Sequence, residues 1–233
     1  MKPYRRYPIS ECGEALKSLR DLGFVLTDPH PYQAFGAPYD SDCPWVARAS
    51  VVQALEAAHK HLQTLRPDWT FRIFDAYRPT RIQSFMVMHE FRTLSGGRAP
   101  EEVPPREAES LWEKTYRIWA EPSENPLTPP PHATGAALDL TLVHPVTGDI
   151  PMGSPIDENS ERSLPDYFQK IDPAIHENRE CLREVMTAAG FERHPEEWWH
   201  FCLGDQMWAW LRSRRLPDEL WVARYGRYDQ ISP

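Results

Sequence analysis

The chain has 233 residues, of which 41% are hydrophobic, and this length suits one substantial domain. Its formal net charge is -8, from 26 basic and 34 acidic residues, which argues against a nucleic-acid partner because such proteins usually present a basic face. No apolar run has the length of a signal peptide or of a membrane span, so the sequence predicts a cytoplasmic protein without a membrane partner.

Apolar spacing predicts helices along most of the chain, separated by segments rich in proline and glycine. The first covers residues 11–22, with Ser10 as its N-cap. The clearest covers residues 48–65 and is stopped by Pro67. Further helices are predicted at residues 80–94, 108–120, 175–189 and 205–215.

Two β-favouring runs lie between these helices, at residues 70–78 and 138–143. Loops are predicted for the stretches rich in proline, glycine or polar residues, namely 23–45, 95–109 and 121–131. This mixture predicts a single α+β domain over residues 1–233, with a central antiparallel sheet flanked by helices. Residues 204–233 form a C-terminal extension, for which packing over the domain and an oligomer contact are both open. The sequence carries no signal for an oligomeric state.

The four cysteines are predicted to be free thiols. They contain no Cys-x-x-Cys pair, and a chain of this length does not depend on disulfides for its stability. They are Cys12, Cys43, Cys181 and Cys202.

A histidine and an aspartate seven residues apart give the strongest chemical signal. His132 lies in a loop marked by three prolines at 129–131, which cannot be helical. Asp139 lies within the run 138–143, where strand alternation would place it on the face opposite the leucines. An imidazole and a carboxylate at such positions are suitable ligands for a divalent metal, zinc above all.

A third ligand is predicted in the segment Glu-Glu-Trp-Trp-His at residues 196–200. Glu197 and His200 are three residues apart, so they can converge on one helical or turn-like face. His132, Asp139 and His200 would leave one tetrahedral position open for water. Glu197 would then act as general base on that zinc-bound water.

Other interpretations of these residues are structural. A single histidine or aspartate is more often a surface or hydrogen-bonding residue, and residues 196–200 could form a packed aromatic patch. His144 could compete as a ligand, but a histidine in a turn is usually solvated. Cys202 is close to His200 in sequence and is interpreted as a small buried residue, not a ligand. The combination of motifs is much less likely to arise by accident than any one of them.

The motifs, in their order, resemble those of the D-alanyl-D-alanine dipeptidases, the VanX-like branch of the zinc peptidase family M15. The resemblance spans roughly residues 30–203 and rests first on His-x6-Asp and Glu-x-x-His. Other segments agree in chain order: Asp75 to Pro79, Met152 to Asp157, Glu161 to Ser163, Asn178 with Arg179, Met186, and Gly190 with Phe191.

The resemblance implies the M15 or Hedgehog-like peptidase fold and one Zn2+ per chain. The implied reaction is zinc-dependent hydrolysis of D-Ala-D-Ala or a related D-amino-acid dipeptide. Glu197 would take the proton from the attacking water and deliver it to the leaving amine. The family gives the arginine of the Asp-x-x-Arg motif, here Arg78, the role of stabilising the oxyanion, and a guanidinium suits that role. Asp75 is assigned to orienting Arg78 or to the fold.

The resemblance also implies substrate-binding residues. Asp157 belongs to a family pocket motif and could receive the amino group of a dipeptide. Glu161 and Tyr39, which lies in a segment that forms a pocket wall in the family, are weaker candidates. One departure affects specificity: Pro130 stands where the family commonly has serine, so any contact from that hydroxyl is lost.

Two alternative functions remain open at this point. The chain could be an M15-type carboxypeptidase acting on longer peptidoglycan peptides, although the expected absence of an export signal argues against it. It could also be a non-catalytic zinc-containing binding protein, although such a protein would need neither Glu197 nor Arg78.

Overall fold

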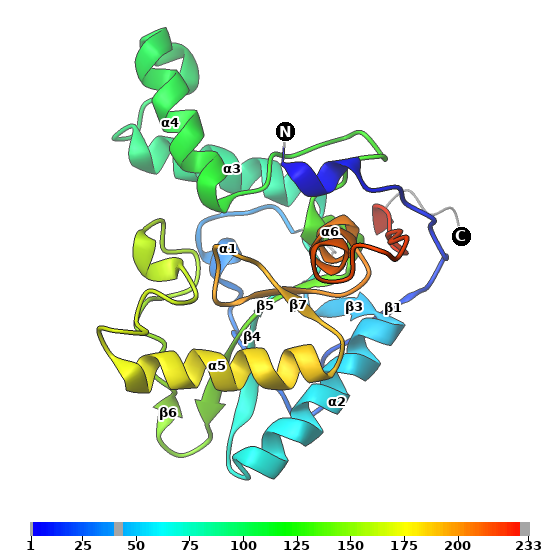
Figure 1. Cartoon of the computed structure of the whole chain (residues 1–233). Coiled ribbons are helices and arrows are strands. Elements are labelled where there is room, and N and C mark those ends of the chain that lie inside the picture. The colour runs from blue at the N-terminus through cyan, green and yellow to red at the C-terminus, as the bar shows by residue number, and fades with distance from the viewer. Residues whose placement is uncertain (1, 40–43, 229–233) are drawn as a thin grey trace.

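A six-stranded sheet runs through the centre of the computed structural model, which describes residues 2–39 and 44–228 (Figure 1). Its strand order is β2-β4-β5-β8-β7, and β6 pairs with the far end of β5. The pairs are antiparallel except β2–β4, which is parallel. The strands are β2 (Val25–Leu26), β4 (Thr70–Asp75), β5 (Ala137–His144), β6 (Gly148–Asp149), β7 (Glu192–Arg193) and β8 (His200–Cys202). The predicted α+β class is confirmed, with a sheet that is antiparallel in all but one pair.

Strand β5 lies in the middle of the sheet, and its hydrophobic side chains and its candidate site residue lie on opposite faces. Leu138, Leu140 and Leu142 are fully buried in the main core. Because side chains alternate along a strand, Asp139 points to the opposite face, as the sequence predicted. In register, Asp139 is paired with Asp75 of β4 on one side and with His200 of β8 on the other. Three polar residues from three strands therefore lie in one row across the sheet.

Two long helices, α2 (Ala49–Leu65) and α5 (Pro173–Ala188), pack on each other and against β4 and β5. The fully buried face of α2 consists of Val51, Leu55, Ala58 and Leu62, which recur at helical spacing. Burying one such leucine contributes roughly 1.5–3 kcal/mol relative to leaving it in water. Both helices confirm the predictions at 48–65 and 175–189 within two residues at each end.

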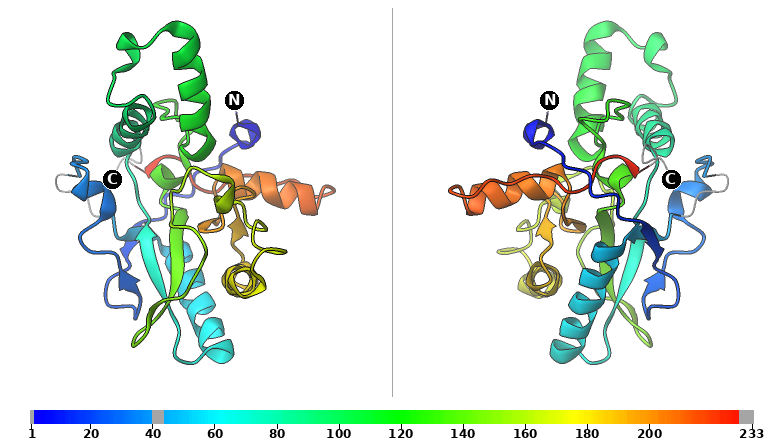
Figure 2. Two further views of the ribbon diagram at one scale, coloured as in Figure 1. Left: turned by 90° about the vertical axis from the view of Figure 1, so that its left-hand side faces the viewer. Right: turned by 90° about the vertical axis from the view of Figure 1, so that its right-hand side faces the viewer.

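A second group of helices lies beyond one end of the sheet (Figures 1 and 2). Helices α3 (Thr80–Leu94) and α4 (Pro105–Ile118) pack on each other, with the rings of Phe91 and Trp112 4.4 Å apart. The 3-10 helix η1 (Pro3–Arg6) packs against α6 (Gln206–Arg215). The shorter pieces are α1 (Pro31–Ala34), η2 (Pro100–Glu102), η3 (Pro131–Thr134) and η4 (Glu161–Ser163). None of the described helices has both the length and the apolar composition needed to cross a membrane.

The helix predicted at residues 11–22 is wrong. The segment is mostly extended, and its strand β1 (Leu16–Ser18) pairs with β3 (Val46–Arg48) in a separate two-stranded sheet. Gly13 has φ +70, in the left-handed region that interrupts a helix. The Glu14 carbonyl accepts a hydrogen bond of 2.7 Å from Arg48, so it serves a tertiary contact where a helix would need it for its own ladder.

Arg48 connects the beginning, the middle and the end of the chain. It is fully buried and donates to Thr134 O at 2.7 Å, to the Glu11 carboxylate at 3.0 and 3.1 Å, and to Gly226 O at 3.1 Å. Its guanidinium also lies 5.0 Å from the ring of Tyr225. Packing over the domain, one of the two options left open for the extension, is therefore what residues 223–228 do.

Cys12, Cys181 and Cys202 are free thiols, as predicted. Cys43 lies outside the described residues.

Candidate active site and metal centre

His132 is held by the loop that joins the α3–α4 region to β5. Its backbone lies in η3, which begins at Pro131, and Gly135 with φ +71 ends that turn. A Cβ at Gly135 would meet Leu16 Cδ2 at 2.5 Å, so the Leu16 side chain would have to shift in addition to the strain of the positive φ. His132 Nδ1 donates to Ala76 O at 2.7 Å. This bond fixes the tautomer and leaves the Nε2 lone pair free to bind a metal.

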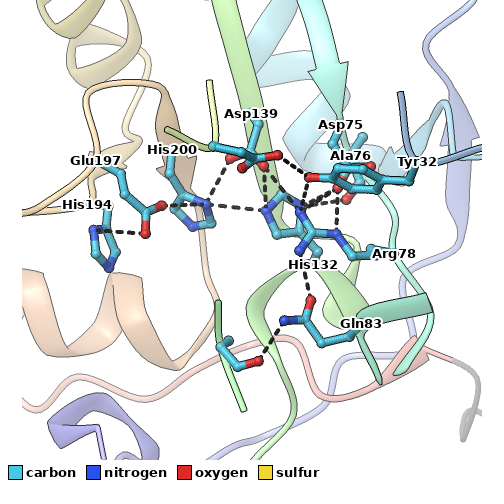
Figure 3. Close-up of polar contacts among 12 residues, drawn as sticks. Tyr32, Asp75, Ala76, Arg78, Gln83, His132, Asp139, His194, Glu197 and His200 are labelled. Carbon is cyan, nitrogen blue, oxygen red and sulfur yellow. Dashed lines mark hydrogen bonds and ion pairs between the residues drawn. The ribbon is translucent and has the colours of Figure 1, made fainter. Parts of the chain in front are cut away.

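The three predicted ligands converge on one point (Figure 3). Asp139 presents one carboxylate oxygen to each histidine: Oδ2 lies 3.2 Å from His132 Nε2, and Oδ1 lies 3.0 Å from His200 Nδ1. The two imidazole nitrogens are 3.3 Å apart. All three side chains are buried. Burial opposes the ionisation of Asp139, but His132 and His200 more than offset it and hold its pKa well below the usual range.

This donor set fits a tetrahedral divalent metal. Zinc binds nitrogen and oxygen at about 2.0–2.2 Å, which places neighbouring ligand atoms of a tetrahedral site about 3.3 Å apart. The 3.3 Å between the two imidazole nitrogens agrees with that spacing, and each nitrogen lies 3.0–3.2 Å from one of the two Asp139 oxygens. Two imidazoles and one carboxylate leave the fourth position open, the arrangement typical of a catalytic site.

Glu197 stands beside these ligands in the loop between β7 and β8. Its Oε2 lies 3.8 Å from His200 Nδ1, and its Oε1 lies 3.8 Å from His194 Nδ1. The next residue anchors the loop, since Trp198 is buried and donates from Nε1 to Ser154 Oγ at 3.0 Å. Burial raises the pKa of Glu197 to about 8, although the charge of His200 opposes that shift. A carboxyl group in that range can both accept and release a proton near neutral pH.

Arg78 lies on the other side of the metal ligands (Figure 3). Its Nε donates to Asp75 at 2.7 Å and its Nη1 donates to Gln83 Oε1 at 2.8 Å. Its Nη2 reaches Tyr32 Oη at 3.2 Å and Asp139 Oδ2 at 3.3 Å. The guanidinium is thus fixed beside a ligand carboxylate, in a position from which it could meet a developing oxyanion.

Asp75 holds Arg78 in place, in agreement with the orienting role expected from the sequence. It is fully buried, and its second oxygen lies 2.9 Å from His30 Nε2. Burial favours the neutral acid, but the charge of Arg78 and the His30 hydrogen bond prevail, so the pKa of Asp75 is well below its usual value. The pair therefore stays ionised.

Asp157 reaches the same cavity from the loop after β6. Its Oδ2 accepts from the Tyr32 hydroxyl at 2.8 Å, and its backbone has φ +64. Few non-glycine residues adopt this conformation, and such residues concentrate at functional sites. Burial and the nearby charge of Asp139 raise the pKa of Asp157 to about 7. A cation beside it would favour its charged form.

The loop that carries Asp157 is tied to the core by Arg179. The Arg179 guanidinium is buried and donates to Met152 O at 2.7 Å, to Leu164 O at 2.8 Å and to Ser154 Oγ at 3.2 Å. Ser154 Oγ also accepts the hydrogen bond from the Trp198 indole N–H, so the Asp157 loop and the Glu197 loop are both anchored at Ser154.

These side chains line one small cavity of about 40 Å³, and the structure separates the predicted site residues into two groups. His132, Asp139, His200, Glu197, Arg78 and Asp157 all line it. Tyr39 does not; it is buried behind the site, with its ring 5.0 Å from that of His30. Glu161 is exposed in η4 and is likewise outside the lining of the described chain.

Two residues weighed as competing ligands lie elsewhere. His144 is at the far end of β5, where its Nδ1 accepts from the backbone N–H groups of Val146 and Thr147 at 3.1 and 3.2 Å. Cys202 points into a hydrophobic cluster that contains Ala137 and Met207.

The sequence did not reveal several residues that line the cavity or hold the side chains that line it. Tyr32 and Gln83 hold Arg78, while His194, Lys2 and Tyr4 lie on the Glu197 side. Tyr32 lies in the segment 23–45, for which the sequence predicted only a loop. Lys2 and Tyr4 are far in sequence from every motif. Only the tertiary structure brings them to the site.

Comparison with known proteins gives a consistent result. The model of one M15 peptidase family, described as D-Ala-D-Ala dipeptidase, matches residues 26–220. A D-alanyl-D-alanine dipeptidase of Synechocystis sp. is 43% identical over 241 residues, covering 98% of this chain and 98% of that relative. A D-alanyl-D-alanine dipeptidase of Enterococcus faecalis is 42% identical over 76 residues, covering 32% of this chain and 37% of the relative.

Among solved structures, a mutant of the vancomycin-resistance D,D-pentapeptidase VanY in complex with Zn(II) is similar, with a TM-score of 0.46 and 12% identity. The similarity covers 73% of this chain and 79% of that one.

The family match reaches further toward both ends than residues 30–203, where the recognisable motifs lie, and it includes α6. The Synechocystis relative extends the similarity over nearly all of both chains. This chain therefore belongs to the D-Ala-D-Ala dipeptidase family of the M15 peptidases, and it is a peptidase.

Proposed function

We propose that this protein hydrolyses the peptide bond of D-Ala-D-Ala or a related D-amino-acid dipeptide, with one zinc ion held by His132, Asp139 and His200. The observation that carries the proposal is the convergence of His132, Asp139 and His200, in which each imidazole nitrogen lies 3.0–3.2 Å from one Asp139 oxygen and 3.3 Å from the other imidazole. The Glu197 carboxylate lies 3.8 Å from His200 Nδ1. A non-catalytic binding protein would have no need of that buried carboxylate.

Zinc, when bound, supplies Lewis-acid polarisation and lowers the pKa of water. Glu197 takes the proton from the attacking water, since its carboxylate stands 3.8 Å from the ligand nitrogen of His200, beside the metal site. It then passes a proton to the leaving amine. Arg78, fixed by Asp75 and Gln83, offers a positive charge to the oxyanion.

The charges at the cavity and the family match support the proposed substrate class. Asp157 and Tyr32 suit an ammonium group, which a free dipeptide carries at its first residue. The cavity is lined by residues of η1, α3, α4 and α6 as well as by the metal ligands. The family match supports a dipeptide as the substrate. Glu161 and Tyr39 have no direct contact with substrate in this proposal because they lie outside the lining. A cytoplasmic location, expected from the sequence, stays part of the proposal.

A turnover assay tests the proposal. The zinc-loaded protein is incubated with D-Ala-D-Ala, L-Ala-L-Ala, the mixed dipeptides and a muropeptide, each with and without a chelator. Chelator-sensitive release of D-alanine from D-Ala-D-Ala is expected. Cleavage of the muropeptide alone would replace the dipeptide with a longer substrate, and cleavage of none, with zinc bound, would contradict the proposed activity.

A further inference from the structure

We infer that Lys2 binds the carboxylate group of the substrate, so that the N-terminal segment, residues 2–7, completes the substrate pocket. This inference rests on the proposed function, because it concerns the free carboxylate of a dipeptide. Lys2 lies outside the matched family range 26–220 and outside every motif, yet it lines the cavity together with Glu197 and His194.

Contacts with distant parts of the chain hold the N-terminal segment in place beside the cavity. Tyr4 is buried in a cluster with Ala137, Cys202 and Met207. The Arg5 guanidinium donates to the Glu121 carboxylate at 2.8 Å and to the Glu121 backbone carbonyl at 2.6 Å. Gln206, at the start of α6, donates to Tyr7 O at 2.6 Å. Lys2 O accepts from Arg5 N at 3.2 Å, so the backbone of Lys2 belongs to this fixed turn.

The orientation of the substrate can be argued from the proposed reaction. Asp157 and Tyr32 lie on the Arg78 side of the metal ligands, where the ammonium group would bind. Glu197 lies on the other side and must reach the leaving nitrogen (Figure 3). The second residue of the dipeptide, with its carboxylate, would therefore extend past Glu197.

That side of the cavity needs a cation, and Lys2 is the side chain that supplies it. Of the two lysine or arginine side chains that line the cavity in the described chain, Arg78 lies on the Tyr32 side, where the proposed mechanism assigns it to the oxyanion. Lys2 has no ion pair with any residue in the ranges 2–39 and 44–228. It lines the same cavity as Glu197 and His194.

His194 cannot replace Lys2 as the cation. Its Nδ1 accepts from the backbone N–H of Glu196 at 3.1 Å, so that nitrogen is unprotonated. That nitrogen therefore has no proton to offer a carboxylate. The loop prolines at 129–131, one of which lines the cavity, have no N–H to offer a carboxylate.

The test compares Lys2→Met with the parent protein on two substrates, D-Ala-D-Ala and D-alanyl-D-alaninamide, which lacks the carboxylate. A lost charge-assisted hydrogen bond predicts a roughly tenfold to hundredfold rise in KM for the dipeptide. The kcat for the dipeptide and both constants for the amide should change little. Lys2→Arg should restore part of the affinity, and Arg6→Met, an exposed change in the same segment, should have no effect.

A binding measurement makes the result independent of turnover. Calorimetric titration of zinc-loaded Glu197→Gln protein, with and without Lys2→Met, should show the same selective loss of affinity for the dipeptide. An equal effect of Lys2→Met on dipeptide and amide would overturn the inference, because Lys2 would then act on Glu197 and not on the carboxylate. No effect on either would overturn it as well. In both cases cleavage of D-Ala-D-Ala by the parent protein would leave the proposed function intact, whereas absence of binding and cleavage in the parent would refute both.

Discussion

Asp139 and His200 face each other across the pairing of β5 with β8, and their side chains meet at 3.0 Å. Their relative position is thus set by the hydrogen-bond register of the sheet and not by a flexible loop. His132 joins them from η3, where its own hydrogen bond to Ala76 O orients the ring. A metal site with two ligands on paired strands is rigid before the metal arrives, which lowers the cost of ordering the ligands.

Removing one ligand charge should abolish metal binding. Asp139→Asn keeps the volume of the side chain but loses the anionic oxygen between the two imidazoles. We expect the bound zinc, measured by elemental analysis after dialysis, to fall from about one per chain to near zero. Asp149→Asn is the control, because Asp149 is an exposed partner of Arg72 far along the sheet. Equal zinc content in the Asp139 variant and the parent would contradict the assigned ligands.

Arg78→Lys should impair the chemical step while leaving the metal in place. Lysine retains the charge but cannot donate to Asp75, Gln83 and Tyr32 in the planar geometry that guanidinium provides. Loss of one oxyanion-stabilising donor typically lowers kcat by about 10²–10³. Steady-state kinetics on D-Ala-D-Ala measure this effect. The matched control is Arg72→Lys on β4, where the side chain forms a partly exposed ion pair with Asp149; a similar kcat for both variants would remove Arg78 from the mechanism.

Arg48→Met should destabilise the fold. The change leaves the Glu11 carboxylate and the carbonyls of Thr134 and Gly226 without their buried donor. Removing one member of a buried charged network typically costs about 3–5 kcal/mol in the free energy of unfolding. Urea denaturation followed by tryptophan fluorescence gives this value. Arg66→Met, at the exposed end of α2, should cost less than about 0.5 kcal/mol, and equal losses in the two variants would refute the role of Arg48.

The parts of the fold that could be predicted are those with strong local patterns. Alternation in β5 placed Asp139 opposite its leucines, and helical spacing defined α2 and α5 closely. The segment 11–22 has the same kind of apolar spacing but is extended, because Arg48 and β3, both distant in sequence, bind its backbone. A local pattern cannot report such a competition.

The site residues likewise divide into those marked by local motifs and those placed only by the tertiary structure. His132, Asp139, Glu197 and His200 were found because they lie in two short motifs, and Arg78 and Asp157 because their motifs resemble a family. Lys2 and His194 reach the cavity only through tertiary packing, and Tyr32 reaches Arg78 and Asp157 in the same way; no spacing in the sequence marks these residues. Tyr39 and Glu161 were attributed to the pocket by resemblance, and the structure places both outside its lining.

The central claim is that Glu197 performs proton transfer at a zinc site held by His132, Asp139 and His200. Its most direct test is the turnover of D-Ala-D-Ala by Glu197→Gln, with zinc content measured on the same sample and Glu196→Gln, an exposed neighbour, as control. We predict full zinc occupancy and a loss of kcat of about 10²–10⁴ in the Glu197 variant, with normal turnover in the control. Unaltered turnover in the zinc-loaded Glu197→Gln protein would contradict the mechanism.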